Sequence, residues 1–455
     1  MLRLTLSCLA LAILAPSAQA ATHRVPSEYP TIQAGIDACQ DGDTVLVAAG
    51  IYSGVGNTGL AFNGLRCVLR SEEGSAATTI DCLGTGKAFS LSEDGASVAT
   101  IEGFTVQGAR DMSDSGGAVR ARDDTLTIRD CLFVDNASSF GGAVRISDGQ
   151  LRVERCVFDE NIASYDGGAI DASVGVSLEV IACQFLGNRA GAIGGGISTG
   201  GTDSVLVRDC VFRGNRGGAI GAGALQLGPH ATVERVEFLE NSSNWDGGAL
   251  LLSGSDSSTL VRDCLFVRNR AEGRDGGAIA MGLDSYSPGS AVLEGCLFYG
   301  NTASWGGGAV SCGNYSTPTF RSCTFVGTPA RAGKGGALSL YWHSEPVLEQ
   351  VLIALNAQGG GIRAVEWSVP HMSCSDVWGN VGGDFIDFAD PTGIDGNISA
   401  DPRFCSAQPD DFTLQANSPC APANNTCGVL MGLYGVDCDS VSVQPRSWGG
   451  IKSMY

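Results

Sequence analysis

One short pattern recurs along this chain about every 26 residues, and a fixed repeat of this length constrains the fold more than any other feature. Each copy holds a Phe, an Asn three residues later, and then a Gly-Gly pair followed by small apolar residues. The clearest copies begin at Phe133, Phe158, Phe185, Phe212, Phe238, Phe266 and Phe298, and weaker copies begin at Phe325 and Ile353. This period indicates one supersecondary unit stacked on copies of itself.

Apolar and polar residues alternate within each copy, as where Val144 and Ile146 flank Arg145. A period of two predicts strands rather than helix. Three such short runs, separated by Gly, Asn and Asp, leave no room for a helix in the unit. We therefore predict an all-β fold, a single-stranded parallel β-helix (a solenoid) of about a dozen coils, with strands of neighbouring coils about 4.8 Å apart.

Stacking places equivalent residues above one another. We expect the repeat Phe residues, together with Phe104, to form an aromatic stack inside the rod. The Asn residues are expected to bond to their own kind at a turn, as residues that tolerate a left-handed backbone. Cysteines two residues before most of the Phe residues form a further inward column, which we interpret as buried free thiols. They are Cys131, Cys156, Cys183, Cys210, Cys264, Cys296 and Cys323, and Cys312 joins them from another inward position.

The first twenty residues have the organisation of a secretory signal peptide. Arg3 supplies the positive start, Leu4 to Leu14 the apolar stretch, and Ala18-Gln19-Ala20 the small-residue cleavage site. This apolar run is too short to span a bilayer, and no other segment approaches a transmembrane span. We expect cleavage near Ala20 and an extracellular or cell-surface location, associated with an outer membrane.

The chain is strongly acidic, with a net charge of −20 at pH 7 and only three lysines, Lys87, Lys334 and Lys452. Such a surface argues against nucleic acid or an anionic membrane as a partner. It leaves cations such as calcium open as ligands, although the sequence predicts no cofactor.

Both ends of a parallel β-helix need covering, because raw strand edges pair with other chains. A short amphipathic helix is predicted from Thr31 to Cys39, before the first coil. The expected organisation is a signal peptide (1–20), an N-terminal cap with the first coils (21–100), β-helix repeats (101–400), a disulfide-stapled C-terminal cap (401–440) and a tail (441–455). We predict two disulfides in the C-terminal cap, with three connectivities open. The four cysteines are Cys405, Cys420, Cys427 and Cys438.

Two sets of residues resemble known families. The run from Tyr29 to Ala38, followed by Gly42-Asp43-Thr44-Val45 and Gly50-Ile51-Tyr52, resembles the opening of right-handed parallel β-helix proteins of the pectin-lyase-like superfamily. The Phe-x-x-Asn and Gly-Gly-Ala repeats resemble those of chlamydial-type polymorphic outer membrane proteins. The resemblance implies a right-handed β-helix and an adhesin-like surface or secreted rod. It also makes a polysaccharide lyase or hydrolase a candidate function, because such enzymes belong to the same superfamily.

One outward column follows the Gly-Gly pairs, where the enzymes of that superfamily carry their sites. It contains Arg120, Arg145, Asp171, Ser198, Gln226, Leu251, Ala280, Ser311, Ser339 and Arg363. It offers one carboxylate rather than the pair that glycosidic acid–base chemistry uses. Arg120 and Arg145 are either a clamp for a carboxylate ligand or a structural ladder neutralised by Asp171, and we prefer the ladder.

Aromatic and acidic residues also recur in the turns before the Gly-Gly pairs. Asp166, Asp246 and Asp275 share a turn position, which we interpret as turn chemistry in preference to a calcium site. The turn aromatics are sugar-stacking platforms in one interpretation and half-buried fillers in the other. They are Phe140, Tyr165, Trp245 and Trp305.

No catalytic, cofactor or metal residues are assigned from the sequence. The ligand-contact face we predict comprises Arg120, Arg145, Asp171, Tyr165, Trp245 and Trp305. We expect a non-catalytic, exported, adhesin-like or glycan-binding β-helix, with an extracellular polysaccharide or a cell-surface protein as partner. Two alternatives stay open, a divergent polysaccharide lyase or glycoside hydrolase and a structural component of the envelope.

Overall fold

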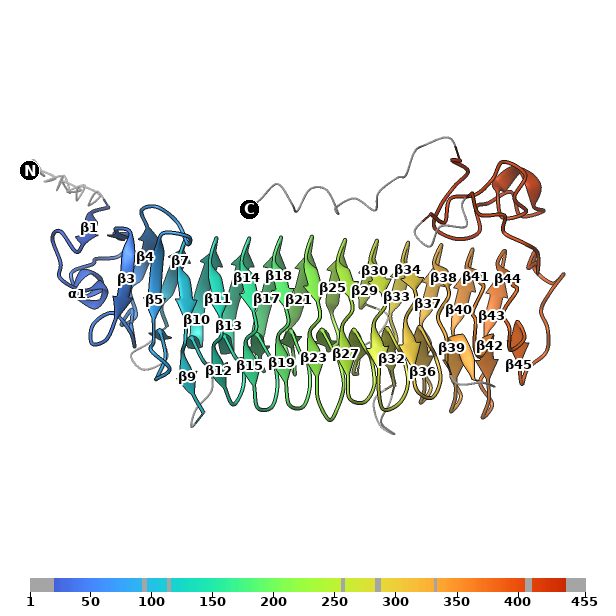
Figure 1. Cartoon of the computed structure of the whole chain (residues 1–455), viewed down its shortest axis with the longest axis horizontal. Coiled ribbons are helices and arrows are strands. Elements are labelled where there is room, and N and C mark those ends of the chain that lie inside the picture. Colours follow the sequence, from blue (N-terminus) through green and yellow to red (C-terminus); the bar gives the residue numbers. More distant parts are fainter. Residues whose placement is uncertain are drawn as a thin grey trace, which may run out of the picture.

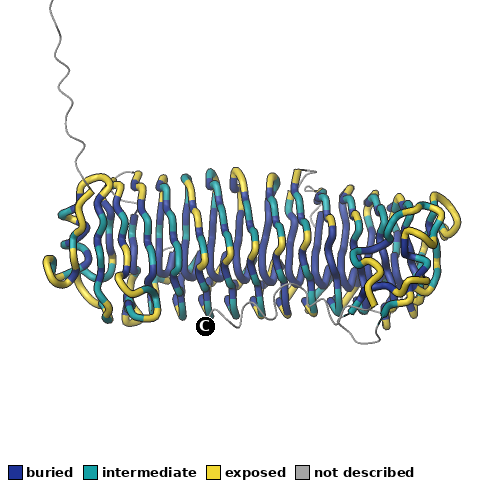
Figure 2. Tube along the Cα trace, turned by 90° about the horizontal axis from the view of Figure 1, so that it is seen from above, coloured by how far each residue is buried: buried dark blue, intermediate teal, exposed yellow. Residues whose placement is uncertain are grey.

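The computed structural model describes residues 20–91, 96–112, 116–254, 258–282, 288–330, 334–405 and 411–438. They form one elongated parallel β-helix of about 12 turns, whose coils follow one another along the rod (Figure 1). Buried residues line the inside of the coils along the rod (Figure 2). The predicted fold class is confirmed.

Strands of successive coils pair side by side in three sheets. The 13-stranded sheet, called here the Phe sheet, contains β3 (Gly50–Ser53), β5 (Thr78–Asp81), β8 (Thr105–Gln107), β11 (Leu132–Val134), β14 (Val157–Asp159), β18 (Gln184–Leu186), β22 (Val211–Arg213), β26 (Glu237–Leu239), β30 (Leu265–Val267), β34 (Leu297–Tyr299), β38 (Thr324–Val326), β41 (Leu352–Ala354) and β44 (Asp376–Trp378). The eight-stranded sheet, called here the short sheet, contains β9 (Arg110–Asp111), β12 (Ala137–Ser138), β15 (Ile162–Ala163), β19 (Arg189–Ala190), β23 (Arg216–Gly217), β27 (Ser242–Ser243), β31 (Arg270–Ala271) and β35 (Thr302–Ala303).

The 24-stranded sheet, called here the long sheet, has two rows joined by β10 (Val119–Arg129) and β13 (Val144–Glu154). The row that follows the Gly-Gly pairs contains β6 (Phe89–Ser90), β16 (Ile170–Ala172), β20 (Ile197–Ser198), β24 (Leu225–Leu227), β28 (Leu250–Leu252), β32 (Ile279–Met281), β36 (Val310–Cys312), β39 (Gly335–Leu340), β42 (Gly360–Ala364) and β45 (Phe385–Ile386). The second row contains β1 (Thr22–Val25), β2 (Thr44–Val47), β4 (Arg66–Ser71), β7 (Val98–Glu102), β17 (Val176–Ile181), β21 (Ser204–Arg208), β25 (Ala231–Glu234), β29 (Leu260–Arg262), β33 (Val292–Glu294), β37 (Thr319–Arg321), β40 (Val347–Glu349) and β43 (His371–Ser373).

A complete coil therefore has four strand segments where the sequence predicted three. The additional strand is the two-residue member of the short sheet, which directly follows the repeat Asn. Two residues are too few to show an alternation of apolar and polar side chains, so sequence periodicity cannot reveal such a strand.

The repeat Phe residues form a continuous stack inside the rod. From Phe133 to Phe325, successive ring centroids are 4.4–5.2 Å apart and the rings lie within 18° of parallel. The prediction is wrong at Phe104, because Val106 pairs with Phe133 while Phe104 occupies the position equivalent to Cys131. Val106 therefore occupies the Phe position in this coil, and the stack of Phe rings begins one coil later, at Phe133.

The repeat Asn residues form a second, polar ladder. Each Asn from Asn136 to Asn269 is fully buried and donates through Nδ2 to Oδ1 of the Asn on the next coil at 2.9–3.0 Å. The left-handed backbone predicted for the Asn belongs instead to the residue before it, such as Asp135 (φ 52°) or Gly187 (φ 62°). The Asn itself can then direct its amide along the rod.

The Gly-Gly pairs make the corner before the long sheet. Gly141 has a φ of 60°, and a Cβ on Gly142 would lie 2.2 Å from the carbonyl oxygen of Gly168. The first glycine is therefore required by its backbone conformation and the second by close packing of coils.

The inward cysteines are buried and free, as the sequence predicted. Each thiol of the column two residues before the Phe position, from Cys131 to Cys323, donates to the carbonyl two residues earlier at 3.1–3.4 Å and to one on the preceding coil at 3.5–3.7 Å. Burial raises the pKa of the thiols of Cys156 and Cys210. A buried thiol with a raised pKa is poorly reactive, which fits a packing role.

The N-terminal end is covered by α1 (Ile32–Asp37), close to the predicted helix. Ile32 and Ile36 are fully buried, and Thr31 caps the helix by accepting a hydrogen bond from the amide of Ala34 at 3.2 Å. The helix thus places its apolar face on the first coil.

The C-terminal segment differs from the predicted end cap. Residues 411–438, with the short 3-10 helix η1 (Pro422–Asn424), lie against the side of the last coils (Figure 1). Phe412 packs on Leu297 and Val326 of the Phe sheet, and Gly432 donates to the carbonyl of Gln350 at 2.8 Å. At the end of the rod, Phe385 and Phe388 pack against the core instead.

The disulfide prediction is wrong at Cys420. Cys405 pairs with Cys438, but the partner of Cys427 is Cys374. Cys420 is a buried thiol that lies 3.0 Å from Oδ2 of Asp376. Cys374 does not belong to the inward column of thiols, because Ser375 takes that position and its hydroxyl accepts from the amide of Val351 at 3.0 Å. Cys374 is thereby at the preceding left-handed turn (φ 45°), which explains why it is available to a partner outside the coils.

We predict that Asn188→Ala lowers the free energy of unfolding by about 2–4 kcal/mol, because it leaves buried amide and carbonyl groups unpaired on two neighbouring coils. The Asn188 amide donates to Asn215 and to the carbonyl of Phe158 and accepts from the backbone and side chain of Asn161. Urea unfolding followed by circular dichroism would measure the change. Ser177→Ala, which removes a surface hydroxyl on β17, is the control and should cost less than about 0.5 kcal/mol. Equal effects of the two substitutions would contradict a structural role for the Asn ladder.

Candidate ligand-binding face

The predicted outward column exists in the register of the long sheet. Arg120 pairs with Arg145, Arg145 pairs with Asp171, and the column continues to Arg363. Its middle is nevertheless buried, in contrast to the prediction of a solvent-facing row. Turn residues cover part of the column, as where Ile193 packs against the buried cluster formed by Ala222, Leu251 and Ala280. The surface available to a ligand is therefore that of these turns.

Arg145 and Asp171 form the ion pair that the ladder interpretation requires. Nε of Arg145 lies 3.3 Å from Oδ2 of Asp171, whose side chain is 8% exposed. Burial raises the pKa of Asp171 to about 7, while the charge of Arg145 opposes that shift. Arg145 also lies 4.6 Å from the ring centroid of Phe140, which stacks on Tyr165 at 5.0 Å. The structure thus brings Arg145, Asp171 and Tyr165 into one group, with Arg120 one coil before it.

Trp245 and Trp305 lie farther along the rod, in the same row of turns as Tyr165. Backbone hydrogen bonds between coils connect this row, from Ala192 to Tyr165, from Arg274 to Trp245 and from Trp305 to Arg274. We call this set the aromatic row: Tyr165, Ile220, Trp245, Arg274 and Trp305. Tyr165, Trp245 and Trp305 are 54%, 44% and 52% exposed, so each is about half-buried and keeps part of its ring accessible to a ligand.

Cations lie against the two tryptophans. The Arg274 guanidinium is 5.3 Å from the ring centroid of Trp245, and Nζ of Lys334 is 5.9 Å from that of Trp305. Contact with a cation restrains the orientation of a large exposed ring. Each of the two tryptophans thus has a cation of this chain as a neighbour.

A buried polar group supports the row from beneath. Oδ1 of Asp246 accepts from the backbone amide of Asp275 at 2.9 Å, and Oδ2 lies 3.7 Å from Nη1 of Arg274. The hydroxyl of Tyr341 lies 3.0 Å from that of Ser311. Burial raises the pKa of Asp246 to about 6 and raises those of Asp275 and Tyr341. Both oxygens of Asp246 face donors of this chain, which is the turn chemistry preferred from the sequence.

This carboxylate pair is poorly placed for acid–base catalysis. A general acid or base must come within hydrogen-bond reach of the substrate. Asp246 is only 1% exposed and Asp275 8% exposed, and both lie behind the aromatic row. Their geometry fits a role in positioning Arg274 and the neighbouring turns.

Sequence reasoning missed Arg274, Lys334 and Tyr341. Arg274 occupies the same turn position as Trp245 and Trp305, which alignment of the Gly-Gly pairs could have revealed. Lys334 and Tyr341 come from a degraded repeat with a longer turn, so no sequence spacing indicates that they approach residues one or two coils away.

Comparison with known proteins agrees with this architecture. A family described as the right handed beta helix region matches residues 87–286, and the Chlamydia polymorphic membrane protein repeat matches residues 295–313. The chain thus has the fold of a right-handed parallel β-helix, and one of its segments matches the polymorphic membrane protein repeat, as its sequence predicted. Curated proteins offer no significant match.

Solved structures with a similar fold include enzymes that act on polysaccharides. The alginate lyase AlyGC of family PL6 superimposes with a TM-score of 0.52 at 12% identity, over 94% of this chain and 58% of the lyase. This chain thus spans little more than half of that protein. A complex of the alginate lyase AlyF-OU02 with G6 gives a TM-score of 0.47 at 12% identity, covering 92% and 96% of the two chains. The GH87 α-1,3-glucanase of Streptomyces thermodiastaticus gives 0.38 at 14% identity, covering 85% and 71%.

At these identities the similarity to solved structures shows the fold alone. Across the described ranges, none of the helices has the length and apolar character needed to cross a membrane.

We predict that Asp171→Asn flattens the pH dependence of stability between about pH 4 and pH 7. The folded-state pKa is about 7 and the usual value is 3.8, so unfolding in this window releases a proton. Stability should therefore fall as pH rises through the window, by up to about 1.4 kcal/mol per pH unit for this group. Asparagine does not titrate and removes that contribution. Thermal melts at several pH values would measure it, with the exposed Asp203→Asn as a control that keeps the wild-type slope. A wild-type slope in Asp171→Asn would contradict the assignment.

Proposed function

We propose that this protein is exported and binds an uncharged polysaccharide along the aromatic row without cleaving it. The observation that carries the proposal is the set of exposed rings of Tyr165, Trp245 and Trp305 on one row of turns along the rod. Exposed aromatic rings in a line provide apolar faces for the flat sides of sugar rings.

The spacing of the row suits an extended polymer. Trp245 and Trp305 are two coils apart, with Arg274 between them, which corresponds to about 10 Å at the usual strand spacing. A polysaccharide parallel to the rod axis would contact successive rings and hydrogen-bond to Arg274. Several weak contacts along one chain then act together.

The charge of the protein favours an uncharged ligand. A net charge of −20 repels polyanions over the whole surface. The cations of the row, Arg274 and Lys334, are partly neutralised by the buried carboxylates of Asp246 and Asp275. The row is therefore expected to attract acidic glycans only weakly.

Export is supported by two features. The predicted signal peptide ends near Ala20, and the disulfides Cys374–Cys427 and Cys405–Cys438 are typical of proteins outside the cytosol. The polymorphic-membrane-protein repeat supports a cell-surface location. A non-catalytic role is favoured over a lyase or hydrolase because Asp246 and Asp275 are buried behind the row.

We predict that the double variant Trp245→Ala/Trp305→Ala binds neutral polysaccharide at least about tenfold more weakly than wild type, because each stacked ring contributes about 1 kcal/mol or more. Co-elution in size-exclusion chromatography and fluorescence titration would measure binding to neutral and acidic polysaccharides. Trp367→Ala removes a tryptophan of a different turn that is more exposed than either of these two, at 77%, and is the control.

The outcomes separate the candidate functions. Binding that is lost only in the double variant supports a glycan-binding protein. Shortened polymer would overturn the non-catalytic proposal and favour a lyase or hydrolase. If the wild-type protein binds none of the polymers and self-associates, a role as a structural component of the envelope would be favoured.

A further inference from the structure

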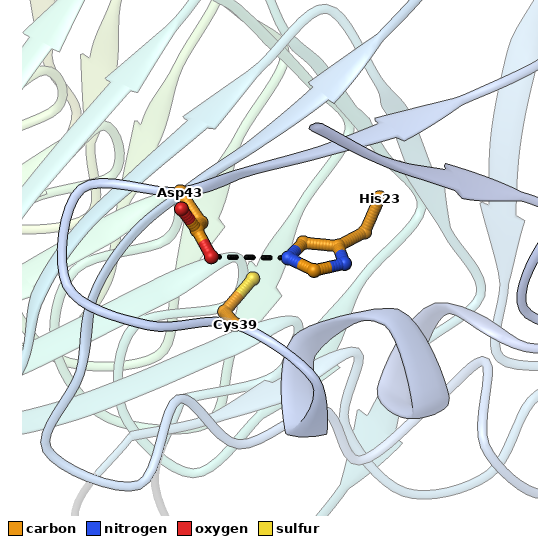
Figure 3. A group of neighbouring side chains, drawn as sticks. All are labelled: His23, Cys39 and Asp43. Carbon is orange, nitrogen blue, oxygen red and sulfur yellow. Dashed lines mark hydrogen bonds and ion pairs between the residues drawn. The ribbon is translucent and has the colours of Figure 1, made fainter. Parts of the chain in front are cut away.

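Three side chains of different chemistry converge beneath the N-terminal cap. His23 lies on β1, Cys39 follows α1, and Asp43 precedes β2 (Figure 3). Their ligand atoms, an imidazole nitrogen, a sulfur and a carboxylate oxygen, all lie within 4.8 Å of one another. Neither the fold nor the glycan-binding face requires this combination.

The donors are directed toward a common point and are largely shielded from solvent. Nε2 of His23 lies 3.0 Å from Oδ2 of Asp43, and their side chains are 13% and 8% exposed. Cys39 is 7% exposed and its sulfur lies beside this pair (Figure 3). Ligands around one small cation with bonds of 2.0–2.3 Å lie about 3–4 Å apart, so small side-chain shifts from the present spacing, which is at most 4.8 Å, would let all three donors reach one ion.

A second layer of contacts orients these donors. Nδ1 of His23 lies 3.1 Å from the hydroxyl of Tyr29, which leaves Nε2 as the nitrogen that faces the group. Oδ1 of Asp43 accepts from the amide of Ala21 at 2.7 Å, and Oδ2 accepts from that of Gln40 at 2.8 Å. Hydrogen bonds of this kind fix ligand orientation in metal sites.

We propose that His23, Cys39 and Asp43 form a structural binding site for a zinc-like divalent transition metal that clamps the N-terminal cap to the first coil. The ion would lie between Nε2 of His23, Sγ of Cys39 and Oδ2 of Asp43, in place of the present His23–Asp43 contact. Imidazole, thiolate and carboxylate are the ligands that zinc prefers. Binding displaces the proton of the Cys39 thiol into solvent, so affinity increases with pH.

The electrostatic surroundings agree with this assignment. The pKa of Asp43 is lowered to about 2, first by the amide of Gln40 and then by His23, so the carboxylate is ionised. The hydrogen bond from Cys67 lowers the pKa of Cys39, and the two sulfurs are 3.1 Å apart. A lowered thiol pKa favours the thiolate that a metal binds. The same proximity makes a Cys39–Cys67 disulfide the competing state.

The test is a titration of metal-free, full-length protein with Co²⁺, which replaces zinc and reports a sulfur ligand by near-ultraviolet charge-transfer absorption. We expect one equivalent of Co²⁺ to bind, Zn²⁺ to displace it, and a chelator to lower the thermal midpoint. Cys39→Ser should abolish the charge-transfer band, and His23→Gln should weaken binding at least tenfold. The matched controls are Cys82→Ser, another buried free thiol, and His371→Gln, an exposed histidine of β43.

Several results would overturn the proposal. One is a charge-transfer band that persists in Cys39→Ser, and another is equal loss of binding in the Cys82→Ser control. A third would come from intact-mass analysis. If the wild-type protein is lighter by two hydrogen atoms because Cys39 forms a disulfide with Cys67, Cys39 has no thiolate to bind a metal. Lack of Co²⁺ binding by wild type with both thiols reduced would exclude the site. None of these readouts depends on polysaccharide binding.

Discussion

Pairing between coils is the constraint on which this structure depends. A single coil is too thin to bury its own apolar side chains, so each coil is stable only when the next one covers it. The hydrogen bonds from Asn to Asn and the stacked Phe rings both act across that interface, one at the turn and one in the core. Both require exact repetition of position, because a shift by one residue would turn a buried Asn or Phe to the outside.

This constraint explains why much of the fold could be predicted from the sequence. Residues that face their own copies must be repeated, and the repeat of Phe158, Asn161 and Gly167-Gly168 therefore indicates the coil, its core and its corners. Prediction was wrong where a repeat was incomplete. Phe104 has the right side chain two positions away from the stack, and Cys374 lies one residue before the inward position that Ser375 occupies. Differences of one or two residues depend on turn conformations that no alternation pattern reports.

The candidate binding face was harder to predict because it does not repeat. Side chains in the turns are free of the stacking constraint, so the residue type at one equivalent position changes from coil to coil. The occupants of this position include Tyr165, Ile220, Trp245, Arg274 and Trp305. Their individual types are visible in the sequence, but their alignment depends on the Gly-Gly corners being in register. Lys334 approaches Trp305 from the next coil, whose turn differs in length from the others. Such contacts follow from three-dimensional packing rather than from spacing along the chain.

The burial of acidic residues beneath this face bears directly on the choice between binding and catalysis. A carboxylate that is stacked into the rod gains packing and a backbone hydrogen bond, as Asp246 does with the amide of Asp275, but it loses solvent and its pKa rises. A catalytic carboxylate needs a perturbed pKa together with access to its substrate. At Asp246 and Asp275 the two requirements are separated, since both carboxylates are buried and the accessible side chains in front of them are those of Trp245, Arg274 and Trp305. Conversion of this face into an active site would require a turn to open above Asp246 or Asp275, which would interrupt the pairing of the coils on either side.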